Sequence, residues 1–166
     1  MREIKDCYIQ TNFPIEKYHD EIVREFNNLK TFKKFTVHKN TVWPYHGMYN
    51  VARLEDVKKA YTLKFIEQEF YQMYKIKSKG RYLELSEGYE LPPHIDTTTK
   101  CAFNYVIEGD SPIIFDDDNH ILDYKKGLIN VSLRHSVPLS KTSRKLLKLS
   151  ISDHTFEEVK NAITRN

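Results

Sequence analysis

The sequence predicts an α+β fold in which amino-terminal helices pack on one sheet of an antiparallel core such as a jelly roll. Two observations lead to this prediction. Before residue 80, apolar residues recur at three- and four-residue steps, which is the spacing of amphipathic helices. After residue 80, short runs of β-branched and aromatic residues are separated by turn residues without an intervening helical pattern, as in antiparallel sandwiches and barrels.

The 166 residues are expected to form a single domain, because a chain of this length with 40% apolar residues can bury one sizeable core. Within it, residues 1–80 are predicted to be a mainly helical support. Residues 81–153 are predicted to form the jelly-roll core, and residues 154–166 a carboxy-terminal helix.

Two helices are predicted in the support. The first lies within residues 13–32, where Pro14 suits a first-turn position and one apolar stripe has helical spacing: Ile15, Tyr18, Ile22, Phe26 and Leu29. The second spans residues 54–74, with a stripe of Leu54, Val57, Tyr61, Ile66, Phe70 and Met73. Between them, the aromatic segment "TVWPYHGMYN" either covers the mouth of the barrel as a lid or packs the helices against the sheet.

The predicted strands follow one another along residues 81–152, and each is rich in residues that favour a half-buried pleated surface. In order they are "RYLELS", "CAFNYVIEG", "SPIIF", "HILDY", "GLINVSL" and "KLLKLSIS". The final segment, "TFEEVKNAITRN", has the pattern of an amphipathic helix.

The net charge and the apolar runs bear on the class of partner. A net charge of +3 with lysines spread along the chain slightly favours an anionic partner, but it is not the basic footprint of nucleic-acid binders. No apolar run approaches the roughly 20 residues of a membrane span, and charges stand where a signal peptide has its apolar region. We therefore expect a cytoplasmic location and no membrane partner. Cys7 and Cys101 lack disulfide-framework or zinc spacing and are expected to be buried thiols.

Two His-x-acid patterns occur, and the predicted elements separate them. Residues i and i+2 point to the same face of a strand, but they lie about 200° apart around a helix. His19 and Glu21 fall in the first predicted helix and cannot share a ligand. His94 and Asp96 enter the β half after two prolines, where an extended backbone is favoured, so both side chains can reach one ion. Imidazole and carboxylate are two ligands of the two-histidine, one-carboxylate facial triad that holds Fe(II).

His135 is the best candidate for the third ligand, because it lies on the apolar face of a predicted strand at residues 131–137. His120 lies in a polar turn and His154 begins the last helix, so both are expected to be solvated. Taken alone, His135 also fits an ordinary core histidine with its hydrogen bonds satisfied.

Arg144 follows His135 by nine residues and opens the next apolar run. Its planar guanidinium is suited to binding a carboxylate in a bidentate fashion, although a strand-end arginine can also lie in solvent or in a structural ion pair. The other basic residues between Lys141 and Lys148 are expected to be solvated.

In this order, His-x-Asp, His and Arg, the second half of the chain resembles the iron(II)/2-oxoglutarate-dependent oxygenases with a double-stranded β-helix core, in particular their small prolyl-hydroxylase-like members. The resemblance covers about Tyr82 to Ser152 and rests on "HID", "RHSV", "SRKLLKLSI" and "FNYVIEG". It implies that His94, Asp96 and His135 bind Fe(II) as the catalytic centre and that Arg144 binds the distal carboxylate of 2-oxoglutarate. It also implies that Tyr82 assists with this carboxylate, while Asn104 can line the same pocket.

The implied activity is a dioxygenase reaction that consumes 2-oxoglutarate and O2, releases succinate and CO2, and hydroxylates a peptidyl side chain or a small molecule. The chain departs from the family's patterns at two positions. Leu146 stands where several branches carry Ser or Thr, which puts a second hydrogen bond to the cosubstrate in doubt. Ser150 stands where the nucleic-acid-dealkylating branch carries a second arginine, which argues against a nucleic-acid substrate.

Two other functions fit the same residues. One is a non-catalytic jelly-roll or cupin-like binding module whose basic surface binds an anionic partner. The other is a cupin-type metalloenzyme that does not use 2-oxoglutarate, although such an enzyme has no reason to place Arg144 beside a metal.

Overall fold

The computed structural model describes residues 2–29, 32–34, 49–52, 59–110, 112–115, 117–139 and 141–165, with the segments 32–34 and 49–52 described by their backbone only. Residues 41–48 of the aromatic segment and residues 54–58 of the predicted second helix lie outside this part of the chain. None of the described helices has both the length and the apolar character that crossing a bilayer requires.

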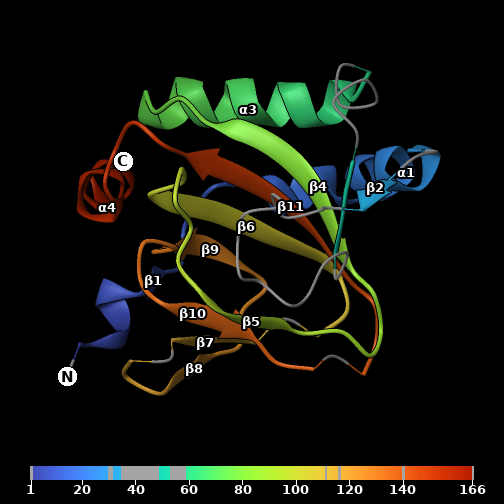
Figure 1. The fold of residues 1–166 in the computed structure, drawn as a ribbon. Helices are drawn as coiled ribbons and strands as arrows, with labels where there is room; N and C mark the ends of the chain where they lie inside the picture. The colour runs from blue at the N-terminus through green and yellow to red at the C-terminus, as the bar shows by residue number, and fades with distance from the viewer. Residues whose placement is uncertain are drawn as a thin grey trace.

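Two antiparallel sheets form the core, as Figure 1 shows. The larger sheet contains, in spatial order, β1 (Tyr8–Ile9), β9 (Lys126–Ile129), β6 (Cys101–Glu108), β11 (Arg144–Ile151), β4 (Lys79–Leu85), β3 (Tyr49–Ala52) and β2 (Phe32–Lys34). The smaller sheet contains β5 (Leu91–His94), β10 (His135–Val137), β7 (Ile113–Phe115) and β8 (His120–Leu122). The predicted double-stranded β-helix core with helices on one sheet is confirmed.

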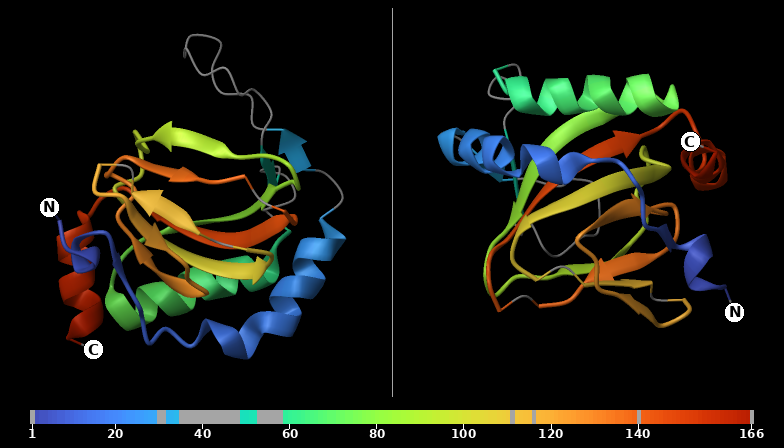
Figure 2. Two further views of the ribbon diagram at one scale, coloured as in Figure 1. Left: turned by 90° about the horizontal axis from the view of Figure 1, so that it is seen from below. Right: turned by 180° about the vertical axis from the view of Figure 1, so that it is seen from behind.

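The helices cover one face of the larger sheet, and the smaller sheet lies against its other face (Figures 1 and 2). After a 3-10 turn, η1 (Ile4–Asp6), the chain forms a second one, η2 (Ile15–Tyr18), which leads into α1 (His19–Asn28). The remaining helices are α3 (Tyr61–Tyr74) and α4 (Phe156–Thr164). The larger sheet therefore has a hydrophobic cluster on each side, one beneath the helices and one between the sheets.

Strand β11 contributes side chains to both sides of the larger sheet, because successive side chains along a strand point to opposite faces. Leu147, Leu149 and Ile151 belong to the cluster beneath the helices. Arg144, Leu146 and Lys148 line a pocket on the opposite side of the sheet, between it and the smaller sheet. The polar groups of the site thus belong to the inner face of the central strands.

The start of α3 is capped from another helix. Both carboxylate oxygens of Glu25 in α1 accept backbone N–H groups, from Thr62 at 2.8 Å and from Leu63 at 2.9 Å. These N–H groups have no partner within α3, and the negative charge also favours the positive end of the helix dipole. Glu25 thereby fixes α1 against α3 over the sheet.

The structure differs from the sequence prediction in two elements. Residues 1–80 are not only a helical support, because β1, β2 and β3 all extend the larger sheet. These strands are two to four residues long, too short for a recognisable alternation. The predicted strand at residues 127–133 ends at Ile129, and a turn occupies residues 131–133 before β10 begins at His135.

Candidate metal centre

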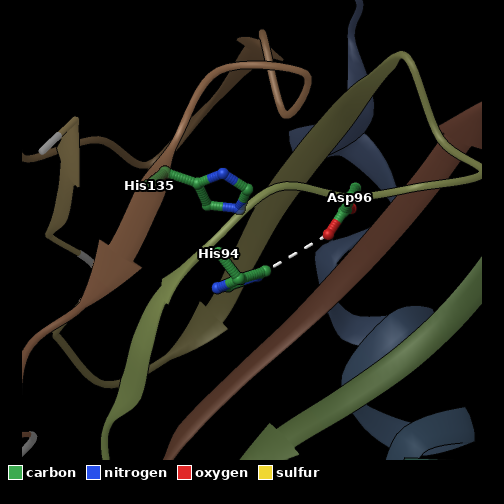
Figure 3. Close-up of side chains that lie close together, drawn as sticks. All are labelled: His94, Asp96 and His135. Carbon is green, nitrogen blue, oxygen red and sulfur yellow. Dashed lines mark ion pairs between the residues drawn. The ribbon is translucent and has the colours of Figure 1, made fainter. Parts of the chain in front are cut away.

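His94, Asp96 and His135 meet in the pocket between the sheets (Figure 3). Each offers one ligand atom, and these atoms all lie within 4.8 Å of one another. The two histidines come from β5 and β10, which pair with His135 directly opposite His94. The predicted trio is therefore brought together by the pairing of two strands that are distant in the sequence.

Asp96 reaches the centre by a different route from the one predicted. Strand β5 ends at His94, so Asp96 is not its strand neighbour but lies in the segment that follows. Its backbone N–H donates to the carbonyl of Val131 at 3.1 Å, which holds this segment beside the turn before β10. Oδ1 of Asp96 then lies 3.6 Å from Nε2 of His94.

Backbone carbonyls select the same tautomer for both histidines. Nδ1 of His94 lies 2.7 Å from the carbonyl oxygen of Pro92, and Nδ1 of His135 lies 2.8 Å from that of Leu133. A carbonyl only accepts hydrogen bonds, so each Nδ1 carries the proton and each Nε2 carries the lone pair. A backbone carbonyl that accepts the Nδ1 proton orients histidine ligands in metal sites in the same way.

Burial keeps His135 neutral. The residue is 5% exposed, and burial together with the neighbouring His94 lowers the pKa of His135 to about 4. A metal ligand must be unprotonated, so this imidazole is ready to bind a cation at neutral pH. The residues present fit a divalent metal of the Fe(II) type, with two imidazole nitrogens and one carboxylate oxygen.

Lys148 is the cation beside this centre. Its Nζ lies 2.8 Å from Oδ2 of Asp96, and the two side chains are only 18% and 21% exposed. Burial raises the pKa of Asp96, but the charge and hydrogen bond of Lys148 outweigh it, so the pKa lies below its ordinary value. The expectation that Lys148 is solvated is therefore wrong, because its side chain is on the inner face of β11.

Arg144 lies at the other end of the same pocket and is 3% exposed. Its Nη2 donates to the phenol oxygen of Tyr124 at 2.8 Å, and Nδ2 of Asn104 donates to the same oxygen at 3.1 Å. Arg144 and Asn104 line the pocket, and the hydroxyl of Tyr124 holds both side chains in place through these two hydrogen bonds. Oδ1 of Asn104 is buried without a hydrogen-bond partner among the described residues, so a donor group in the pocket would satisfy it.

Tyr82 does not belong to this site, which corrects the role expected for it. It is fully buried beneath the helices, where its ring packs edge-on against Phe26 and its hydroxyl donates to Oε1 of Glu25 at 2.7 Å. Its strand neighbours Leu83 and Leu85 line the pocket instead, because they differ from Tyr82 by odd numbers of positions along β4. The tyrosine that contacts Arg144 is Tyr124, a residue that no sequence pattern singled out.

The other histidines considered as ligands lie elsewhere. Nε2 of His120, on β8, lies 2.7 Å from the backbone oxygen of Arg2. His154 precedes α4, and its carbonyl accepts the thiol of Cys101 at 3.8 Å. Neither joins the cluster formed by His94, Asp96 and His135.

Comparisons with known proteins place the fold. No protein-family model matches the sequence, and no curated protein is similar enough to match it. A prolyl hydroxylase from Trichoplax adhaerens, solved with a hypoxia inducible factor oxygen degradation domain peptide, superimposes with a TM-score of 0.58 at 14% identity, over 93% of this chain and 86% of that one.

Two bacterial structures give similar agreement. A Pseudomonas putida prolyl-4-hydroxylase matches with a TM-score of 0.55 and 12% identity, over 86% of this chain and 90% of that one. A Burkholderia pseudomallei oxidoreductase of the 2OG-Fe(II) oxygenase family matches with a TM-score of 0.54 and 12% identity, over 82% and 78%. Over most of its length, this chain has the fold of prolyl hydroxylases and related 2-oxoglutarate–Fe(II) oxygenases.

Proposed function

We propose that this protein is an Fe(II)- and 2-oxoglutarate-dependent dioxygenase that hydroxylates a peptidyl side chain or a small molecule. One observation carries the proposal: two histidine Nε2 atoms and one carboxylate converge in the same pocket that holds a buried arginine. Neither feature alone is specific. Together, on this fold, they supply a site for a metal and a site for a carboxylate within one cavity.

The side chains of the pocket would have three roles in the reaction. His94, Asp96 and His135 would hold Fe(II), which when bound supplies the site where 2-oxoglutarate and O2 react to give succinate and CO2. Arg144 would bind the distal carboxylate of 2-oxoglutarate with its guanidinium fork, and Tyr124 holds that fork in place. Apolar side chains line the rest of the pocket and exclude water from the reacting groups: Leu83, Leu91, Ile113, Val131, Val137 and Leu146.

The substrate class is the less specific part of this proposal. The Trichoplax adhaerens structure was solved with a peptide bound, which supports a peptide as one substrate class to consider. The pocket between the two sheets also suits a small molecule. Nucleic acid is the least favoured substrate class, because the basic residues are spread along the sequence and are not clustered.

The proposal is tested by metal binding and turnover in matched variants. The parent protein is expected to bind Mn(II) or Fe(II) and to convert 2-oxoglutarate to succinate. His94→Ala, Asp96→Ala and His135→Ala should each lose most metal affinity, whereas His120→Ala should behave as the parent. Equal metal affinity in all five proteins would refute the metal centre.

A second candidate is a metal-free module that binds an anionic partner. The ion pair between Lys148 and Asp96 favours it, because this contact satisfies the carboxylate without a metal. Such a module would show no metal-dependent 2-oxoglutarate turnover, and its partner binding would weaken steeply with salt. The same metal titration therefore separates the two functions.

A further inference from the structure

Two cations stand opposite each other on the inner face of the larger sheet, at the metal end of the pocket. Lys148 of β11 pairs in register with Arg81 of β4, just as Leu146 pairs with Leu83 and Arg144 with Leu85. Since Leu83 and Leu85 line the pocket, alternation along β4 places Arg81 on the same face. Like charges directly opposite each other destabilise a sheet, so this pair needs an anion to compensate it.

Asp96 does not supply that compensation once a metal is bound. Its Oδ2 accepts one hydrogen bond from Lys148, whose ammonium has three donors and one partner among the described residues. Its Oδ1 faces His94 on the metal side. One carboxylate therefore serves both Lys148 and the metal, and it carries a single negative charge.

A charge count shows what is missing. Fe(II) contributes +2, a bound 2-oxoglutarate −2, Asp96 −1, Arg144 +1 and Lys148 +1, with both histidines neutral, so these groups sum to +1, and Arg81 on the same face adds a further positive charge. Without Lys148 and Arg81 the sum would be zero. A largely buried positive charge without a counter-ion is costly, and it favours an anionic ligand.

2-Oxoglutarate cannot be that ligand if its distal carboxylate is on Arg144. Arg144 and Lys148 are four residues apart on one strand, which separates their backbones by about 13 Å. Both carboxylates of 2-oxoglutarate would already be used, the distal one on Arg144 and the other at the metal, so the Lys148 end of the pocket remains for a second molecule.

We propose that Lys148, together with Arg81, binds an anionic oxygen group of the primary substrate, a carboxylate or a phosphate, beside the metal centre. This inference rests on the proposed function and names the substrate class for the same site. The substrate would place its anionic group on Lys148 and the C–H bond to be oxidised over the metal. Lys148 is thus a specificity-determining residue.

The test uses the full chain loaded with Mn(II) and saturating 2-oxoglutarate. Three small probes are titrated in turn: acetate, methyl phosphate and the neutral acetamide. The paramagnetic relaxation of their methyl protons by Mn(II) reports binding close to the metal without any turnover. The variants are Lys148→Met, Lys148→Arg and, as a matched control, Lys145→Met, which removes a cation from the outer face of the same strand, where it pairs with Glu108.

At least one anionic probe should bind the parent more tightly than acetamide. Tighter binding of acetate would identify the substrate group as a carboxylate, and tighter binding of methyl phosphate would identify it as a phosphate. The dissociation constant of that probe should rise about tenfold or more in Lys148→Met, because a charge-assisted hydrogen bond is lost. Lys148→Arg should restore most of the affinity, and Lys145→Met should match the parent.

Two results would overturn the inference while leaving the proposed function intact. One is a protein that binds Mn(II) and 2-oxoglutarate but shows no preference for the anionic probes over acetamide. The other is anion binding that Lys148→Met leaves unchanged. A protein that binds neither Mn(II) nor 2-oxoglutarate would refute the proposed function, and the inference with it.

Discussion

The neutral, buried His135 predicts how the stability of the metal-free protein depends on pH. In the folded protein the pKa of His135 is about 4, against an ordinary value of 6.5. Between these values the unfolded chain binds a proton that the folded chain does not bind. The contribution of His135 is therefore present in full above about pH 6.5 and is lost as the pH falls towards 4.

The size of the effect follows from these two values. The full difference corresponds to about 3 kcal/mol, since one pKa unit is worth about 1.4 kcal/mol. By pH 5 about 2 kcal/mol of the free energy of unfolding should be lost relative to pH 7.5. His135 is almost fully buried, so solvent screening removes little of this.

The assay is urea denaturation of the metal-free protein at several pH values, with His135→Asn as the comparison. Other groups also titrate in this range, so the measured quantity is the difference between the two slopes of stability against pH. The parent should lose about 2 kcal/mol more than His135→Asn between pH 7.5 and pH 5. Equal slopes would refute the conclusion that His135 is buried in its neutral form.

Three further substitutions test individual contacts. Tyr82→Phe should lower the free energy of unfolding by about 1.5–3 kcal/mol, because the hydrogen bond to the Glu25 carboxylate is lost. The affinity for 2-oxoglutarate, measured by calorimetry, should stay unchanged, and weaker binding would show that Tyr82 does contact the cosubstrate. Arg144→Lys keeps the charge but loses the planar fork, so 2-oxoglutarate should bind about tenfold more weakly, and parent-like affinity would count against bidentate binding. Gly127→Ala should cost about 1–3 kcal/mol in chemical denaturation, because a Cβ there meets the Tyr8 ring and the Ile9 carbonyl; an unchanged midpoint would show that Tyr8 can move aside.

The sequence predicted His94, Asp96 and His135 as a set because each stands in or beside a recognisable extended segment. It could not show that Asp96 lies beyond the end of β5, since the strand boundary depends on pairing with β10. The short strands of residues 1–80 were missed for a related reason: they are edge or near-edge segments fixed by their neighbours in the larger sheet rather than by their own pattern.

The error over Tyr82 has a specific physical origin. On a strand with one face in solvent, the alternation of apolar and polar residues shows which residues face the core. Strand β4, however, is covered by helices on one face and by the smaller sheet on the other. Apolar residues therefore occupy both faces, and periodicity does not tell which face contains the site. Tyr124 and Arg144 are in contact although they are 20 positions apart in the sequence, and no local pattern encodes that contact.

Lys148 is the residue that the sequence could have identified. It has the same parity on β11 as Arg144, so a strand that directs Arg144 into the pocket must also direct Lys148 to that face. A lysine on an inner face is rarely buried without a negatively charged partner. In the site loaded with metal and 2-oxoglutarate, the negative charges present do not fully balance this lysine.

The joint binding of Fe(II) and 2-oxoglutarate in this pocket is tested most simply by an anaerobic titration of the Fe(II)-loaded protein with 2-oxoglutarate, followed by the weak visible charge-transfer band of the iron chelate. The band is expected to appear in the parent protein and to require much higher 2-oxoglutarate concentrations in Arg144→Ala. A protein that binds Fe(II) and never develops the band, or an Arg144→Ala variant that titrates as the parent does, would contradict this expectation.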